Sequence, residues 1–274
     1  MMAFCSMLPK QTRVDGLGVR FFEAGQGAPV MLLHGASLGS SADVWIRNLA
    51  PLAAHGLRVI APDLPGFGGT DNPTDNSVGY RRKFIPLFMD ALKIDRAALV
   101  GHSQSGRVAL DLAIAEPQRI AKLVVLATGS LLPPLAEKAE SEGEEGGAAE
   151  PTLEDTRKLL EDNLYNRALI TPDELGLRHR MSTGKNFKAF LGRQAAKGKG
   201  GKGESPWQKV AKCPVPLLML YGANDRGEAA KRAKKAKELN PQLRLEILPR
   251  CAHLVQWDAA EEFAQRAGSF LKVN

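Results

Sequence analysis

A serine flanked by small residues is the most reactive feature of the sequence. Ser103 lies between a short apolar run and an amphipathic stretch, in the segment Val100-Gly101-His102-Ser103-Gln104-Ser105-Gly106. A serine at such a strand–turn–helix junction is exposed at the carboxyl end of a sheet, the geometry of a nucleophile elbow. The turn is crowded and needs small neighbours such as Gly101, and Ser105 stands where glycine is usual. The segment therefore predicts a nucleophilic Ser103, with a helix N-cap serine as the alternative.

Two further polar residues follow predicted strands and could activate this serine. Asp225 comes after the apolar run that ends at Gly222, and His253 comes after the last apolar run. Serine needs a base within hydrogen-bond reach, and an imidazole base needs a carboxylate that fixes its tautomer and stabilises its charged form. We therefore expect Ser103, Asp225 and His253 to form a triad. Asp258, shortly after the histidine, is the nearest rival acid.

A loop after an earlier strand could complete the site. An acyl-transfer enzyme needs two N–H donors aimed at the oxyanion that forms in the transition state. One donor is predicted to be the backbone N–H of Gln104, the residue after the nucleophile. The other is expected to be Ala36, in the segment Leu33-His34-Gly35-Ala36-Ser37-Leu38-Gly39. His34 is interpreted as structural, and the alternative for the whole loop is a simple strand-ending turn.

Short apolar runs alternate with helical patterns along most of the chain. After a β-hairpin over Thr12–Gly25, the expected strands are Val30–Leu33, Arg58–Ala61, Ala97–Val100, Leu123–Leu126, Leu217–Tyr221 and Leu243–Leu248. The expected helices are Val44–His55, Val78–Leu92, Ser105–Ala115, Glu228–Leu239 and Ala259–Phe270. Apolar runs that alternate with helices form a mostly parallel sheet with helices on both sides. We therefore predict an α/β fold with a core of residues 1–130 and 213–274.

The alternation stops between residues 131 and 212, where no clear strand is predicted. Helical patterns are expected from Leu153 to Asn166 and from Pro172 to Leu191. An acidic, glycine-rich tract (residues 137–150) and a lysine–glycine tract (residues 197–203) are poor in apolar residues, which predicts mobility. We interpret residues 131–212 as a helical cap inserted into the core. The alternative, an insertion without function, suits the two tracts better than the helical middle.

The composition is that of an ordinary globular protein, with 44% hydrophobic and 24% charged residues in 274. The net charge of +7 is concentrated in two basic stretches without interleaved aromatic residues, so we expect solvated surface and no nucleic-acid partner. No apolar run approaches the ~18 residues of a membrane span. Three distant cysteines and the absence of a signal-peptide pattern favour the cytoplasm; they are Cys5, Cys213 and Cys251. No metal or organic cofactor is expected.

Together these motifs resemble the α/β-hydrolase superfamily over almost the whole length of the chain. The order serine, aspartate, histidine is the order of that fold, and it differs from the order in chymotrypsin and subtilisin. A further hallmark is the loop Asp63-Leu64-Pro65-Gly66-Phe67-Gly68-Gly69-Thr70-Asp71. A serine nucleophile separates the chain from the haloalkane dehalogenase and epoxide hydrolase branches, which carry aspartate.

A narrower resemblance is to the meta-cleavage product hydrolases, cytoplasmic enzymes that are often dimers or larger assemblies. The residues that carry it are Cys251-Ala252-His253-Leu254-Val255-Gln256-Trp257-Asp258 and Thr171-Pro172-Asp173-Glu174-Leu175. This resemblance implies that an arginine of the cap binds the dienoate and carboxylate end of the substrate. Arg178 is the candidate, Arg180 is a neighbour that stays open, and a solvated helical arginine is the alternative. Ser37 and Trp257 are further candidates for substrate contacts.

The predicted reaction is C–C bond hydrolysis of a 2-hydroxy-6-oxo-dienoate, a small molecule held in a mostly apolar pocket. The chain departs from the narrower family at His102 and at Ser105, so the exact substrate stays open while the hydrolase chemistry does not. A carboxylesterase or lactonase with the same triad is the first alternative. A non-catalytic ligand receptor on this fold is the second. Since an ester needs no help from a cation near a carboxylate, substitution of Arg178 would discriminate the first two.

Overall fold

The computed structural model describes residues 8–135, 149–196 and 204–272. Cys5, the lysine–glycine tract and nearly all of the acidic tract lie outside these residues. Within the described ranges, no helix combines the length and the apolar character that crossing a membrane requires. The same residues contain no cluster of three or more His, Cys, Asp or Glu side chains that could hold a metal ion.

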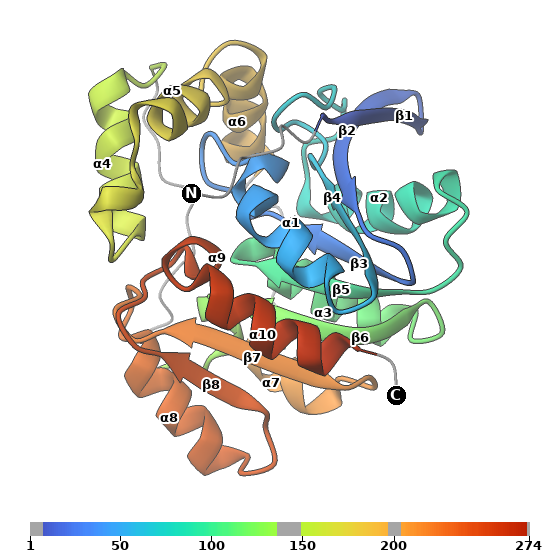
Figure 1. Ribbon diagram of the computed structural model, residues 1–274, viewed down its shortest axis with the longest axis vertical. Coiled ribbons are helices and arrows are strands. Elements are labelled where there is room, and N and C mark those ends of the chain that lie inside the picture. Colours follow the sequence, from blue (N-terminus) through green and yellow to red (C-terminus); the bar gives the residue numbers. More distant parts are fainter. Residues whose placement is uncertain (1–7, 136–148, 197–203, 273–274) are drawn as a thin grey trace.

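An eight-stranded sheet forms the centre of the molecule (Figure 1). Its strands are β1 (Lys10–Val14), β2 (Leu17–Ala24), β3 (Ala28–Leu33), β4 (Leu57–Pro62), β5 (Ala97–His102), β6 (Ile120–Leu126), β7 (Leu217–Gly222) and β8 (Leu245–Leu248). The order is β1-β2-β4-β3-β5-β6-β7-β8. The pairs from β4 through β8 are parallel, whereas the β1–β2 hairpin joins β4 in antiparallel fashion. The predicted α/β fold with a mostly parallel sheet is therefore confirmed.

Helices cover both faces of the sheet and bury every other strand residue on each side. On one face, Val30 and Leu32 join the cluster of α1 (Ile46–Ala53) and α10 (Ala260–Leu271). On the other face, Met31 and Leu33 join the cluster of α2 (Val78–Ala91), α3 (Gln104–Ala115) and α8 (Ala229–Leu239). Burial on both faces explains why the strands appear in the sequence as continuous apolar runs. Short elements complete these layers: η1 (Ala42–Trp45), η2 (Gly129–Leu131) and α9 (Val255–Asp258).

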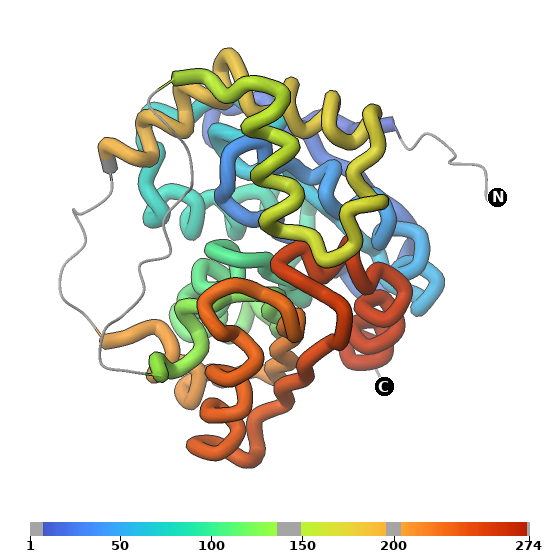
Figure 2. Tube along the Cα trace, turned by 90° about the vertical axis from the view of Figure 1, so that its left-hand side faces the viewer, coloured from blue at the N-terminus to red at the C-terminus, as the bar shows by residue number. Residues whose placement is uncertain are grey.

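Three helices between β6 and β7 gather on one side of the molecule, at the top of Figures 1 and 2. They are α4 (Leu153–Asn163), α5 (Pro172–Arg180) and α6 (Lys185–Ala196), with η3 (Arg167–Leu169) between the first two. One continuous helix was expected over residues 172–191, but the structure has two helices there, α5 and α6. The break falls before α6, where Gly184 has a φ of +60°, a left-handed conformation that glycine adopts without strain.

The end of the predicted cap range packs against the core. Two short helices occur there, α7 (Pro206–Lys209) and η4 (Val210–Lys212). Lys209 Nζ donates to Asp111 Oδ1 of α3 at 2.7 Å, and Val210 belongs to the apolar cluster on that face of the sheet. Helices α5 and α6 and the segment that follows α4 contact the core elsewhere.

Candidate active site

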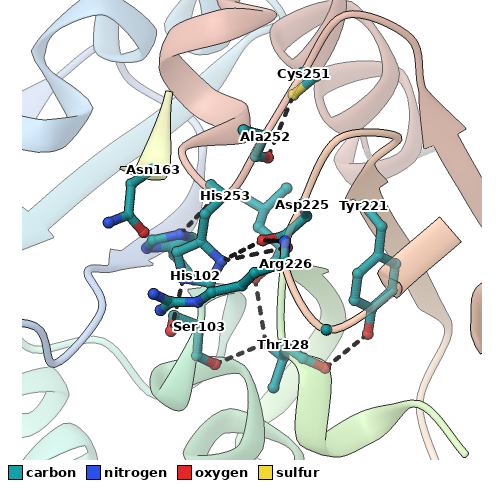
Figure 3. A network of polar contacts seen from close by, with 12 residues as sticks. His102, Ser103, Thr128, Asn163, Tyr221, Asp225, Arg226, Cys251, Ala252 and His253 are labelled. Carbon is teal, nitrogen blue, oxygen red and sulfur yellow. Dashed lines mark hydrogen bonds and ion pairs between the residues drawn. The ribbon is translucent and has the colours of Figure 1, made fainter. Parts of the chain in front are cut away.

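The nucleophile elbow forms at the predicted serine. Strand β5 ends at His102, helix α3 begins at Gln104, and Ser103 between them has φ 53° and ψ −128°. This backbone is unusual for a residue with a side chain, and surrounding contacts must hold it. A Cβ on Gly101 would lie 2.6 Å from the Gly106 Cα, so glycine is needed at that position. Thr128 Oγ1 donates to the Ser103 carbonyl at 2.7 Å and fixes the turn from the end of β6 (Figure 3).

In the predicted triad, His253 lies within hydrogen-bond distance of both Ser103 and Asp225 (Figure 3). His253 Nε2 is 3.1 Å from Ser103 Oγ. His253 Nδ1 is 3.0 Å from Asp225 Oδ1 and 3.2 Å from Oδ2. Because the carboxylate only accepts, Nδ1 carries the proton and donates it, which leaves Nε2 to accept from the serine hydroxyl. This arrangement can activate Ser103 as a nucleophile.

The loops after β7 and β8 meet through close backbone contacts. A Cβ on Gly222 would lie 2.3 Å from the carbonyl oxygens of Cys251 and Ala252, so only glycine allows this approach. The N–H of Asn224 donates to the Cys251 carbonyl at 2.9 Å. These contacts bring the turn that bears Asp225 against the loop that bears the histidine.

His102, the residue before Ser103, supports His253. Its side chain is buried and its ring centroid is 4.9 Å from that of His253. Its Nε2 donates to the backbone carbonyl of His253 at 3.0 Å. Burial lowers the pKa of His102 well below its ordinary value, so the ring is neutral. Its uncharged ring thus holds the backbone of His253 in place.

The predicted oxyanion loop runs directly past the nucleophile. A Cβ on Gly35 would lie 3.0 Å from His102 Nδ1 and 3.2 Å from Ser103 Cβ, and the buried Ala36 follows. Gln104 is the first residue of α3, where helix N–H groups lack intrahelical partners. Both N–H groups predicted to bind an oxyanion therefore belong to backbone beside Ser103.

His34 anchors that loop as a neutral ring. Its Nδ1 donates to the Gly35 carbonyl at 2.7 Å, and its Nε2 accepts the N–H of Leu64 at 3.0 Å. Complete burial lowers the pKa of His34 to about 3. Ser105 Oγ donates to the His34 carbonyl, which gives the serine in the usual glycine position a structural partner.

A cap arginine reaches the same loop. Arg178 Nη2 of α5 donates to Ser37 Oγ at 2.8 Å, and Ser37 Oγ lies 3.1 Å from Ser40 Oγ. The Nε of Arg178 is shielded from solvent and has no hydrogen-bond partner among the described residues. Desolvation lowers the pKa of Arg178 to about 10. Arg180, in contrast, is exposed at the end of α5.

Trp257 lies at the junction of core and cap. Only 8% of it is exposed, and its Nε1 donates to the Val44 carbonyl at 2.8 Å. The Arg47 guanidinium lies 5.1 Å from the centre of its ring and also pairs with Glu174 of α5 at 2.9 Å. None of the contacts described for Trp257 joins it to the triad, so its role in substrate binding stays a prediction.

Several supporting residues escaped the reasoning from sequence. Thr128, His102 and Asp258 act on backbone carbonyls and N–H groups near the triad. Their only available signal was position, since each lies at or near a strand end or beside a predicted site residue. Each of these side chains bonds to a backbone group, and a sequence pattern does not show which backbone group will lie within reach.

Known proteins resemble this chain over most of its length. A model of the alpha/beta hydrolase family matches residues 30–266. A 2-hydroxy-6-oxo-6-phenylhexa-2,4-dienoate hydrolase from Burkholderia cepacia is 31% identical over 263 residues, which cover 91% of this chain and 89% of that protein. A 2-hydroxy-6-oxononadienedioate/2-hydroxy-6-oxononatrienedioate hydrolase from Comamonas testosteroni is 31% identical over 258 residues, with the same coverage. The solved structure of a mutant meta-cleavage product hydrolase from Pseudomonas fluorescens IP01 has a TM-score of 0.75 and 25% identity, and covers 95% of this chain and 96% of that chain.

Proposed function

Because this chain belongs to the α/β-hydrolase family, we propose that it hydrolyses a C–C bond of a 2-hydroxy-6-oxo-dienoate. The names of the relatives from Burkholderia cepacia and Comamonas testosteroni support this substrate class. Ser103 is the nucleophile, His253 the base and Asp225 the residue that orients the base. The distances of 3.0–3.2 Å that link these three residues support the assignment.

The position of Arg178 is the observation that carries the choice of substrate. This cation donates to Ser37 in the oxyanion loop, and its shielded Nε has no hydrogen-bond partner among the described residues. A desolvated charge without an opposite charge is costly, and a carboxylate from the substrate would compensate it. The planar guanidinium suits a carboxylate because it can donate two parallel hydrogen bonds. An ester or lactone without a carboxylate would leave this cation without a role.

The contacts of Ser103 and His253 indicate how the reaction would proceed. Ser103 Oγ attacks the carbonyl carbon beside the bond to be cleaved, and its proton passes to His253 Nε2. The N–H groups of Ala36 and Gln104 bind the resulting oxyanion. The C–C bond then breaks, and its electron pair passes to the departing fragment, which takes the proton from His253. Water, deprotonated by His253, finally releases the acyl group from Ser103.

The leaving group explains why a cation is needed. A carbanion leaves poorly, so the dienol must first convert to its keto form, into which the electron pair of the broken bond can delocalise. Arg178 beside the substrate carboxylate would stabilise this charge. An ester requires no such step because its alkoxide or phenolate leaves readily. The triad therefore supplies acyl chemistry in general, and Arg178 directs it to the dienoate.

A spectrophotometric assay of two substrates tests the proposal. Wild type and Ser103→Ala are each given a coloured 2-hydroxy-6-oxo-hexa-2,4-dienoate and a short p-nitrophenyl ester. We expect the wild type to bleach the dienoate faster than it cleaves the ester, and Ser103→Ala to do neither. Cleavage of the ester alone would assign an esterase or lactonase. Tight binding of the dienoate without turnover would assign a ligand receptor.

The proposal also includes a location in the cytoplasm and assembly into a homodimer or a larger homo-oligomer. The two described cysteines, Cys213 and Cys251, are free, which supports a reducing compartment. Burial raises the pKa of the Cys251 thiol, so this residue is inert. Analytical ultracentrifugation of the purified protein would test the assembly, since a single monomeric species would contradict it.

A further inference from the structure

Asp258 in α9 connects the histidine loop to the cap. One of its oxygens, Oδ2, accepts the N–H of Ala252 at 2.8 Å and the N–H of Tyr165 at 2.9 Å. The other, Oδ1, accepts the N–H of Asn166 at 2.9 Å. Ala252 directly precedes His253, whereas Tyr165 and Asn166 come two and three residues after Asn163, the last residue of cap helix α4. One carboxylate therefore bridges the two segments through three backbone donors.

The other side of the histidine is tied to the same end of α4. The N–H of Leu254 donates to the carbonyl of Asn163, the last residue of α4, at 2.9 Å. His253 thus lies between two residues that are both joined to the cap. From the core, His102 bonds to the carbonyl of His253 and Asp225 bonds to its ring. The backbone on both sides of His253 is nevertheless joined to α4 and to the segment that follows it.

The chemistry of Asp258 fits this bridging task. A carboxylate only accepts hydrogen bonds and offers about four lone-pair directions, enough for three N–H groups. An asparagine would place an NH₂ group where one carboxylate oxygen now accepts a hydrogen bond. Its NH₂ group and the backbone N–H would both be donors, so that bond would be lost. Asp258 is also not the triad acid, since Asp225 contacts the His253 ring and Asp258 contacts the backbone before it.

We infer that Asp258 is a positioning residue that couples the placement of cap helix α4 to the orientation of His253. The inference rests on the proposed function, because it takes His253 to be the base of the triad. When α4 is docked, both neighbours of His253 are fixed and its Nε2 reaches Ser103. When the bridge is lost, the imidazole is aimed less well, although Ser103, Asp225 and the sheet are intact.

The test uses a fluorophosphonate probe, which reports the serine–histidine geometry without a dienoate. Ser103 Oγ forms a bond to phosphorus, fluoride leaves, and the serine proton passes to His253. We expect Asp258→Asn to lower the rate constant of this reaction by ~10- to 100-fold, because small misplacements of a catalytic group cost about this much. The kcat for a p-nitrophenyl ester should fall in parallel, while its KM is unchanged. Asp258→Glu keeps both oxygens and should recover part of the rate.

Lys185→Met is the matched control. It removes the hydrogen bond from Lys185 of α6 to the Thr70 carbonyl of the core, a cap contact that involves neither the histidine loop nor α9. Its phosphonylation rate should equal that of the wild type. Equal slowing in both variants, or no slowing in Asp258→Asn, would overturn the inference. Failure of the wild type to react at Ser103 would instead overturn the proposed triad, so the two failures are distinguishable.

Hydrogen exchange in the wild type keeps the inference testable if Asp258→Asn does not fold. Amides that open in one cooperative unit exchange with the same free energy of opening. We therefore expect the N–H groups of Ala252 and Tyr165 to show equal protection, although they are far apart in the sequence. Rapid exchange at Tyr165 with strong protection at Ala252 would show that the cap moves without the histidine loop, and would overturn the coupling.

Discussion

The predicted triad and the cap arginine, Arg178, differ in how many of their polar atoms have a hydrogen-bond partner. At the strand ends, His253 is bonded to both Ser103 and Asp225, and backbone contacts hold the loops that carry them. On the cap, Arg178 has one bond to Ser37 and an Nε without a described partner. In the core, His253 thus has a partner on each ring nitrogen, whereas in the cap Arg178 keeps a shielded donor without a described partner.

The two regions are also attached by different means. The strand ends are fixed by the register of the sheet, in which β5 and β6 are neighbours and β7 pairs with β8. Helix α6 of the cap is fixed by side chains that bond to the backbone of the loop after β4: Lys185 to Thr70, Asn186 to Gly68 and Arg193 to Gly66. Bonds to backbone carbonyls tolerate changes in the side chains of that loop. The side chains of that loop can therefore vary, whereas the attachment depends on the side chains that α6 contributes.

The largest effect is expected from removing the hydroxyl of Ser103 in the predicted triad. Ser103→Ala should lower kcat by about 10⁴- to 10⁶-fold for the dienoate and for an ester alike, because both reactions require the same attack. Steady-state kinetics with both substrates, with the unfolding midpoint as the control for folding, would measure this. A residual rate near that of the wild type would show that the triad is not the catalytic apparatus.

Removing the charge of Arg178 tests whether this cap residue selects the substrate. Arg178→Met keeps the apolar stem and removes the charge. We expect kcat/KM for the dienoate to fall by about 10²- to 10³-fold, the effect of leaving a carboxylate without its desolvated partner. Hydrolysis of the p-nitrophenyl ester should be almost unchanged.

Arg180→Met is the matched control for this substitution, because Arg180 is exposed two residues further along the same helix. It should leave both reactions unchanged. If Arg180→Met lowers dienoate turnover as much as Arg178→Met, a diffuse positive field and not the contact of Arg178 selects the substrate.

More of the core than of the cap could be predicted from the sequence. The strands were predictable because residues such as Val30 and Met31 are buried on opposite faces, which leaves a continuous apolar run. The triad was predictable because Ser103, Asp225 and His253 each follow such a run, and parallel strands end at one edge of the sheet. In the cap, the helical pattern concealed the break at Gly184, since the apolar residues continue through it.

What could not be predicted are the bonds between side chains and backbone. Thr128 to the Ser103 carbonyl, His102 to the His253 carbonyl and Asp258 to three N–H groups all depend on where distant segments meet. Every residue except proline offers the same backbone donor, so a sequence pattern does not single out the partner. Arg178 was found only through a resemblance, because one arginine on a helix is ordinarily solvated.

The neutral histidines of the core predict a loss of stability in acid. The folded-state pKa of His34, about 3, lies below the ordinary histidine value of 6.5. Between these values the unfolded chain binds a proton that the folded chain does not, so stability present above about pH 6.5 is lost as the pH falls. For His34 the loss from about pH 7 to pH 5 is about 2 kcal/mol. The lowered pKa of His102 acts in the same direction.

Urea unfolding of the wild type and His34→Asn over this pH range measures the effect. The variant loses hydrogen bonds and should be less stable at every pH. Its free energy of unfolding should nevertheless depend less steeply on pH, because one proton-linked group is absent. Parallel slopes for the two proteins would show that His34 is protonated in the folded state, contrary to its burial and its bond from Leu64.

The smallest effect is expected where the core departs from the usual motif. Ser105 donates its hydroxyl to the His34 carbonyl and is 3% exposed, so Ser105→Gly leaves a buried acceptor without this partner. We expect a loss of about 1 kcal/mol in the free energy of unfolding, the usual net value of one hydrogen bond. Ser105→Ala, which loses the same bond but not the helix preference, should be slightly more stable than Ser105→Gly. Both should keep the kcat of the wild type, because the Ser103 turn requires only a small residue there. A marked fall in kcat for both variants would instead show that the Ser105 hydroxyl, through the loop of Ala36, sets the geometry of the oxyanion site.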